Sequence, residues 1–99
     1  MPKKPETIFK EKVLEELRKM KNSYWIKIQQ LSIRGIPDII GVVNGRFVAL
    51  ELKKSHQEKA DKLQEYVLEE VDKAGGIALV TNPENFEEVK GYITKQTSF

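Results

Sequence analysis

The chain of 99 residues has no cysteine and one histidine, His56. Without cysteine there can be no disulfide scaffold, thiolate zinc site, iron–sulfur cluster or cysteine nucleophile. A single histidine excludes a metal site built from several imidazoles. Catalytic chemistry would therefore depend on carboxylates, lysines, hydroxyls or a metal that prefers oxygen ligands. We interpret His56 as a solvated residue at a helix start rather than as a catalytic base, and we expect no organic cofactor.

Long apolar runs are also absent. No segment approaches the ~18 apolar residues of a membrane span, and the N-terminus shows no apolar secretory signal, so we expect no membrane association. Hydrophobic residues make up 39% and charged residues 32% of the chain, as in soluble domains. The length suits a single domain over 1–99, and the composition is compatible with a cytoplasmic location.

The net charge of +2 says little about partners. Residues 1–21 hold seven Lys or Arg against four Glu. Two interpretations stay open for this segment, a basic end that meets phosphate and a plain solvated helix face.

Hydrophobic periodicity predicts the element order αβββαβα. Helices are expected over 5–21, 56–74 and 83–95, strands over 24–29, 38–43, 46–53 and 77–81, and a loop over 30–36. The last strand is reached through a helix, which favours a crossover and a mixed sheet, and so an α/β fold. In the second helix an apolar stripe is expected to pack on the sheet, formed by Ala60, Leu63, Val67, Val71 and Ala74.

The Asn44-Gly45 pair is the strongest turn signal in the chain, because both positions tolerate positive φ in a two-residue hairpin. Such a turn fixes the register, so that the numbers of each facing pair sum to 89. Asp38 and Glu51 form one such pair, and their Cβ atoms would lie about 4.5–5.5 Å apart on one face of the sheet.

Two like charges placed directly opposite each other destabilise a sheet. One carboxyl could stay protonated, Lys53 could neutralise one, or a divalent cation could bridge both. A fourth possibility is that the charges sit in water at a frayed strand end. Lys53 follows Glu51 on the same face, where an ammonium can orient a water or stabilise charge on a phosphoryl group.

The residues Pro37-Asp38, followed after twelve residues by Glu51-Leu52-Lys53, resemble the motif of the PD-(D/E)XK nuclease superfamily. The surrounding sequence resembles its VRR-NUC (virus-type replication and repair nuclease) family, small stand-alone phage-type members in particular. The likeness rests on the segments 35–40, 48–53, 63–66 and 74–78, and on the first-helix acid Glu6; it covers roughly residues 6–93.

The resemblance implies a restriction-endonuclease-like core and a metal-dependent, structure-selective DNA endonuclease. Asp38, Glu51, the Leu52 carbonyl and Glu6 would hold Mg²⁺ or Mn²⁺. Lys53 would be the catalytic lysine, and Gln64 would complete the catalytic set. Glu11 is the alternative to Glu6.

The resemblance further implies branched DNA such as Holliday junctions as the substrate, a homodimer, and a bacterial or phage-infected cell as the setting. A homodimer also follows from the chemistry, because symmetric cutting of two strands needs two sites. Other interpretations are a catalytically silent nucleic-acid-binding domain, a small interaction protein and a sequence-specific restriction-type enzyme. Arg34 and Lys54 are either phosphate contacts or plain surface. Tyr24 and Trp25 are expected in the core or a partner interface rather than stacked on bases.

Overall fold

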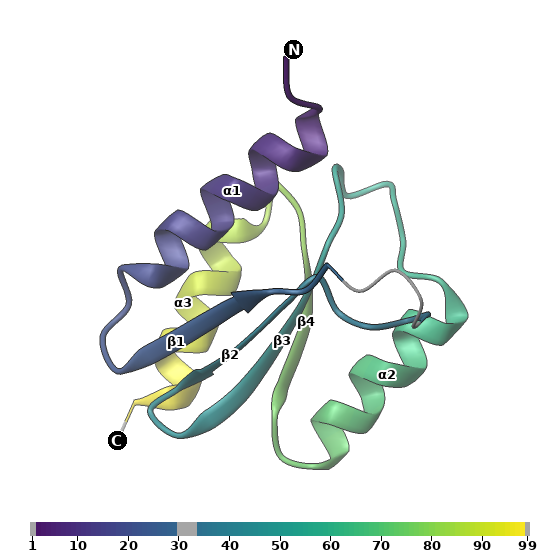
Figure 1. Ribbon diagram of the computed structural model, residues 1–99. Coiled ribbons are helices and arrows are strands. Elements are labelled where there is room, and N and C mark those ends of the chain that lie inside the picture. The colour runs from purple at the N-terminus through teal and green to yellow at the C-terminus, as the bar shows by residue number, and fades with distance from the viewer. Residues whose placement is uncertain (1, 30–33, 99) are drawn as a thin grey trace.

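A computed structural model describes residues 2–29 and 34–98 of the chain. The chain forms a four-stranded sheet with helices on both faces (Figure 1). The elements are α1 (Pro5–Arg18), β1 (Ser23–Lys27), β2 (Ile39–Val43), β3 (Arg46–Leu52), α2 (Lys62–Lys73), β4 (Ile77–Thr81) and α3 (Phe86–Thr97). The predicted order and the mixed α/β fold class are confirmed.

The sheet has the strand order β1-β2-β3-β4. β1, β2 and β3 are antiparallel neighbours, whereas β4 lies parallel to β3 after the crossover through α2. Asn44 and Gly45 adopt φ values of 50° and 83°, as a two-residue hairpin requires. The ladder pairs Val43 with Arg46 and Ile39 with Leu50, so the predicted register is confirmed.

One face of the sheet forms the core together with α1 and α3. Its buried side chains come from both helices and all four strands: Val13, Leu14, Leu17, Trp25, Ile39, Val43, Val48, Leu50, Ile77, Phe86, Val89 and Ile93. Alternation along β3 directs Val48 and Leu50 to this face. Gly41 faces Trp25 across the β1–β2 pair, and a Cβ at Gly41 would lie 2.4 Å from the indole ring. The absence of a side chain there is what allows the ring to enter the core.

The other face carries α2, which packs over β3 and β4. The predicted burial of its apolar stripe is wrong in part, because α2 has no buried residue. Val67 and Val71 are half-buried, Leu63 and Ala74 are exposed, and Ala60 precedes the helix. The helix therefore covers only part of this face and leaves β1 and β2 bare.

Two predicted helix starts are corrected. The helix expected from residue 56 begins at Lys62, because Asp61 caps it. The Asp61 carboxylate accepts from the backbone N–H of Gln64 at 2.9 Å, and the Gln64 side-chain oxygen accepts from the backbone N–H of Asp61 at 2.9 Å. The helix expected from 83 begins at Phe86, after a turn in which the Asn82 side chain accepts from the N–H of Glu84 and Asn85.

Smaller corrections apply elsewhere. The first helix ends at Arg18 instead of 21, and the last continues to Thr97 instead of 95. The strand expected over 24–29 begins one residue earlier and ends two residues earlier, the strands over 38–43 and 46–53 are each one residue shorter, and the strand over 77–81 is confirmed. Of the predicted loop over 30–36, residues 30–33 lie outside the described residues, and the rest includes a turn with Gly35 at a φ of 79°.

Candidate functional site

Asp38 and Glu51 come together where β2 begins and β3 ends. The confirmed register, carried one pair beyond Ile39 and Leu50, sets Asp38 opposite Glu51. Asp38 itself precedes β2, and its Oδ2 accepts from the Leu52 N–H at 2.8 Å. This bond fixes the Asp38 carboxylate against the end of β3 in place of a ladder bond. The two carboxyl groups therefore lie next to each other, as expected, where the β2–β3 ladder ends.

Glu51 is a buried carboxyl with an incomplete set of partners. Its exposed fraction is 4%. Oε1 accepts from the Gln64 Nε2 at 3.2 Å, whereas Oε2 has no hydrogen-bond partner among the described residues. Burial, and then the neighbouring Asp38 carboxylate, raise the pKa of Glu51 to about 8, while Lys53 acts in the opposite direction. The site thus favours the protonated form of Glu51 at neutral pH unless a positive charge is added.

Gln64 connects Glu51 with Lys53. The Lys53 ammonium donates to the Gln64 side-chain oxygen at 3.0 Å and lies 3.9 Å from a Glu58 carboxylate oxygen. The same Gln64 oxygen accepts from the N–H of the helix-capping Asp61. The first turn of α2 therefore holds the Gln64 side-chain amide in place. This amide in turn orients the Glu51 carboxyl group and the Lys53 ammonium group.

Lys10 of α1 is a member of the site that the sequence analysis missed. Its ammonium lies 3.4 Å from the Asp38 Oδ1. Lys10 falls one helical turn after Glu6, and residues four apart share a face of a helix. That spacing from a candidate ligand is the signal that could have identified it.

A cleft of about 190 Å³ opens over these groups. Its lining comes from α1, the residue before β2, the end of β3 and the segment after β3: Glu6, Phe9, Lys10, Asp38, Glu51, Leu52, Lys53, Lys54 and Glu58. All but one of the predicted site residues line this cleft. The exception is Gln64, which does not line it but forms hydrogen bonds with Glu51 and Lys53.

The structure separates the two candidate acids of α1. Glu6 lines the cleft. Glu11 pairs with Lys3 at 2.9 Å and lines a different groove. No three His, Cys, Asp or Glu side chains in residues 2–29 and 34–98 gather into a group that could hold a metal ion. The candidate metal centre is thus a pair of carboxylates, and direct ligation by Glu6 stays a prediction.

The other residues singled out in the sequence have different surroundings. His56 lies 2.7 Å from the Glu84 carboxylate and is exposed. Lys54 lines the cleft, whereas Arg34 is exposed on the segment before β2. Trp25 is buried in the core, and Tyr24 is exposed.

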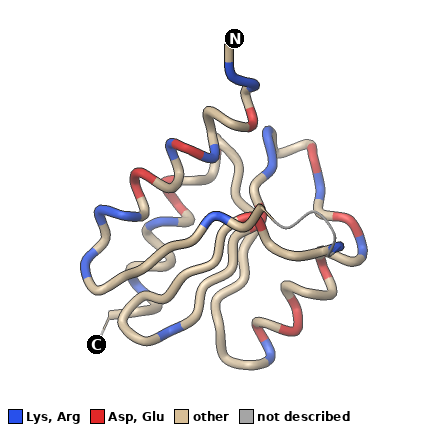
Figure 2. Tube along the Cα trace, in the orientation of Figure 1, with Lys and Arg blue, Asp and Glu red and all other residues tan. Residues whose placement is uncertain are grey.

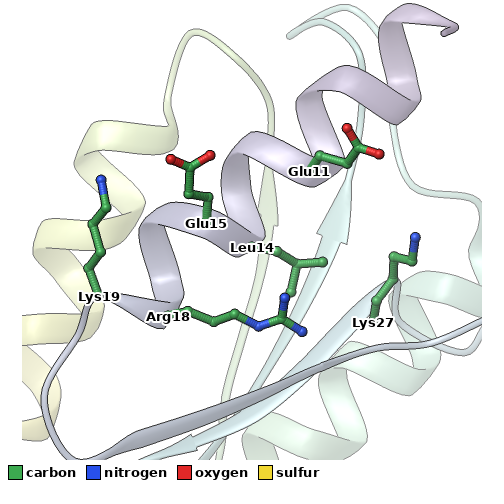
Figure 3. A pocket seen from close by; sticks show the side chains of 6 residues that line it. All are labelled: Glu11, Leu14, Glu15, Arg18, Lys19 and Lys27. Carbon is green, nitrogen blue, oxygen red and sulfur yellow. The ribbon is translucent and has the colours of Figure 1, made fainter.

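A second groove, of about 590 Å³, lies between α1 and the end of β1 (Figure 3). It is lined by Glu11, Leu14, Glu15, Arg18, Lys19 and Lys27. Lys27 pairs with Ile39 in the ladder, so this groove begins beside the end of the sheet that carries Asp38. Its charges are mixed, with three cations and two carboxylates.

Comparison with models of known protein families and with curated proteins finds no match for the chain. Among the described residues, no helix is both long and apolar enough to cross a membrane. The geometry of the site therefore carries the functional argument.

Proposed function

We propose that this protein is a metal-dependent DNA endonuclease of the VRR-NUC type within the PD-(D/E)XK superfamily. One observation carries the proposal. Glu51 is buried beside a second carboxylate, has an oxygen without a partner in residues 2–29 and 34–98, and faces a cleft that also holds Lys53. A fold selected for stability alone gains nothing from this arrangement, because it leaves an acceptor unsatisfied and raises the cost of ionisation.

The donor set fits a divalent cation that prefers oxygen ligands. Asp38 and Glu51 would hold Mg²⁺ or Mn²⁺, with the Leu52 carbonyl and Glu6 as further ligands. When bound, such a cation supplies a water of lowered pKa and a positive charge for a phosphate. The cation's charge would also offset the repulsion between the two carboxylates and favour the ionised form of Glu51.

The chain's own side chains have distinct roles in this proposal. Lys53, only 10% exposed at its side chain, orients the attacking water or neutralises charge on the phosphate. Gln64 is a positioning residue, because it fixes Glu51 and Lys53 without lining the cleft. Lys10 holds Asp38 in place while the site is empty of substrate. The product expected from the family likeness carries a 5′-phosphate.

Branched DNA, such as a Holliday junction, is the proposed substrate, in a bacterial or phage-infected cytoplasm. Phosphate contacts would come from Lys54 at the cleft and from Arg18 and Lys27 in the groove beside it. Contacts of this kind select DNA shape rather than sequence and weaken steeply with salt. Cutting two strands of a junction calls for two sites, so the proposal includes a homodimer.

The test is cleavage of labelled four-way junction, flap and linear duplex DNA with Mg²⁺, Mn²⁺ or EDTA. We expect metal-dependent cutting of branched DNA that is lost in Glu51→Gln and retained in the control Glu88→Gln, which removes an exposed carboxylate of α3. A parallel thermal scan should show that Mn²⁺ stabilises the wild type and not Glu51→Gln.

Two negative outcomes separate the alternatives. A folded protein that binds branched DNA without cutting any substrate would be a silent binding domain. A folded protein that neither binds nor cuts DNA, and that Mn²⁺ does not stabilise, would be an interaction protein with a carboxylate pair of another purpose.

A further inference from the structure

The face of the sheet that carries α2 has a bare region, which we call the shelf. It consists of the outward side chains of β1, β2 and the start of β3: Tyr24, Ile26, Val42 and Phe47. Tyr24, Val42 and Phe47 form one row across three strands, because Tyr24 pairs with Val42 and Val42 with Phe47. Four exposed apolar residues that adjoin one another are unusual on a solvated sheet.

The shelf continues into a groove beside α2. The groove is about 460 Å³ in volume and is lined by Phe47, Tyr66, Val67, Glu70, Val71, Ala74 and Gly76. Tyr66 and Leu63 of α2 are also exposed, so the helix presents an apolar flank next to the shelf. We call α2 with its exposed Leu63 and Tyr66 the ridge. The surface is therefore an apolar shelf beside this ridge.

We infer that this surface is the contact between two copies of the chain, with the α2 ridge of each copy packed on the shelf of the other. The homodimer itself rests on the proposed function, whereas the contact surface follows from the shape, area and charge of this face.

The shape selects the symmetry. Two copies can pack face to face about a two-fold axis that lies in the plane of contact. If this axis runs perpendicular to the strands, the α2 ridge of one copy meets the α2 ridge of the other, and both shelves stay uncovered. An axis parallel to the strands places each ridge on the partner's shelf, so one isologous contact covers the exposed apolar groups of this face. The α2 helix, none of whose residues is fully buried in one copy, would then bury its apolar flank.

The exposed apolar area is of the required size. Tyr24, Tyr66 and Phe47 are 66%, 60% and 44% exposed. At about 200 Å² for a whole aromatic side chain, their exposed parts alone amount to roughly 340 Å². A standard interface removes about 800 Å² per partner, of which about two-thirds is apolar in homodimers. The aliphatic neighbours Ile26, Val42 and Leu63 supply much of the difference.

The charges at the border of this face favour a protein over a nucleic acid. Glu70 lies in the groove and interacts with the Tyr66 hydroxyl, and α2 has four carboxylates against two lysines. Phosphates would be repelled there. Beyond the opposite edge of the shelf, the turn from α1 to β1 carries the exposed Lys21 (Figure 2), whereas the neighbouring Lys19 pairs with Glu16 at 2.9 Å. Rotation about an axis parallel to the strands brings this turn of one copy towards α2 of the other, a helix whose carboxylates outnumber its lysines.

The same rotation has a consequence for the candidate site. It preserves position along the strands, so both copies hold their Asp38 and Glu51 at the same end of the dimer. Two cutting sites would then face one DNA molecule from one side.

The test measures the mass of the full chain by light scattering and sedimentation across concentration, in EDTA and without DNA. The matched variants are Tyr66→Lys on α2 and Tyr92→Lys on α3, two exposed helical tyrosines of which only the first lies on the proposed surface. We expect a wild-type dimer, at least a tenfold weaker dimer for Tyr66→Lys, and no change for Tyr92→Lys. Phe47→Lys on the shelf should weaken the dimer in the same way.

Circular dichroism and the fluorescence of buried Trp25 check that each variant is folded. A dimer that persists in folded Tyr66→Lys and Phe47→Lys would overturn the inferred surface and leave the homodimer of the proposed function standing. A wild-type monomer at all concentrations would overturn both the surface and the homodimer. A monomer that binds single-stranded DNA, with binding lost in Tyr66→Lys, would assign the exposed aromatic side chains to base stacking instead. None of these results depends on whether the protein cuts DNA.

Discussion

The two faces of the sheet differ in what covers them. On the face of α1 and α3, alternate residues of β3 such as Val48 and Leu50 are fully buried. On the face of α2, Phe47 of the same strand is exposed, while Glu51 is buried and lacks a full set of partners in the part of the chain that the structure describes. Stability is thus concentrated on one face, and the unusual chemistry and the open apolar surface lie on the other.

The largest effect should come from the core face. Leu50→Ala deletes a buried side chain and should lower the free energy of unfolding by about 2–5 kcal/mol. Val42→Ala, on the shelf, should cost less than about 1 kcal/mol in the monomer, because it leaves no cavity. Urea unfolding at a protein concentration low enough to populate the monomer measures the loss in each variant. Equal losses would contradict the comparison of the two faces.

Gln64 tests whether the α2 face is built for function. Gln64→Ala removes the amide that orients Glu51 and Lys53 and should lower cleavage about 10–100-fold, as for groups that position metal ligands. Part of the loss would reflect the weakened helix cap, so Asp61→Ala is the matched control. Single-turnover rates with saturating Mn²⁺ should fall much less in Asp61→Ala. Similar rates in both variants would show that Gln64 acts only as a helix cap.

The pH dependence of stability should separate Glu51 from ordinary carboxylates. Its pKa is raised to about 8 in the fold, against 4.5 for the unperturbed group. The folded state therefore holds the proton more tightly than the unfolded state, and this contribution to stability is fully present below about pH 4.5 and is lost as pH rises through 8.

Glu51→Gln mimics the protonated group, so in EDTA it should melt at a higher temperature than the wild type at pH 9. A difference of about 5 °C would correspond to roughly 1 kcal/mol in a domain of this size. The difference should vanish near pH 4.5. Thermal melts at a series of pH values measure it, and parallel curves for the two proteins would contradict the raised pKa.

The smallest effect should distinguish the two acids of α1. Glu6→Gln should lower cleavage, because Glu6 lines the cleft. Glu11→Gln should leave cleavage unchanged and shift stability by less than about 1 kcal/mol, since it breaks only an exposed pair with Lys3. Cleavage rates with limiting Mn²⁺ make the comparison most sensitive, and a reversed order would move the role to Glu11.

The parts of the molecule governed by local rules were predictable from sequence. Asn44-Gly45 fixed the hairpin, and the register then brought Asp38 to Glu51 without any knowledge of the fold. The start of α2 was also within reach, because Asp61 and Gln64 have the spacing of a capping box. The predicted start at residue 56 is too early because it includes the charged segment before this cap.

Other features depend on packing and have no local signature. The stripe of Val67 and Val71 has the period of a buried face, yet period alone does not say how much sheet lies beneath it. The ion pair of Lys10 with Asp38 joins residues 28 positions apart, and the orientation of the first helix decides it. Tyr24 and Trp25 point to opposite faces of β1, so the exposure of the first and the burial of the second follow from which face the helices cover.

Gln64 closes the first turn of α2 and also holds Glu51 and Lys53. Because α2 buries none of its residues, its backbone amides should exchange hydrogen through local opening well before those of β3. Each such opening would release the Gln64 side chain from Glu51 and Lys53 while the rest of the chain stays folded, so the site would lose its arrangement. If the protein cuts DNA as proposed, the opening equilibrium of this one helix would set the fraction of molecules that are active, and a ligand or partner that stabilises α2 would act as an activator.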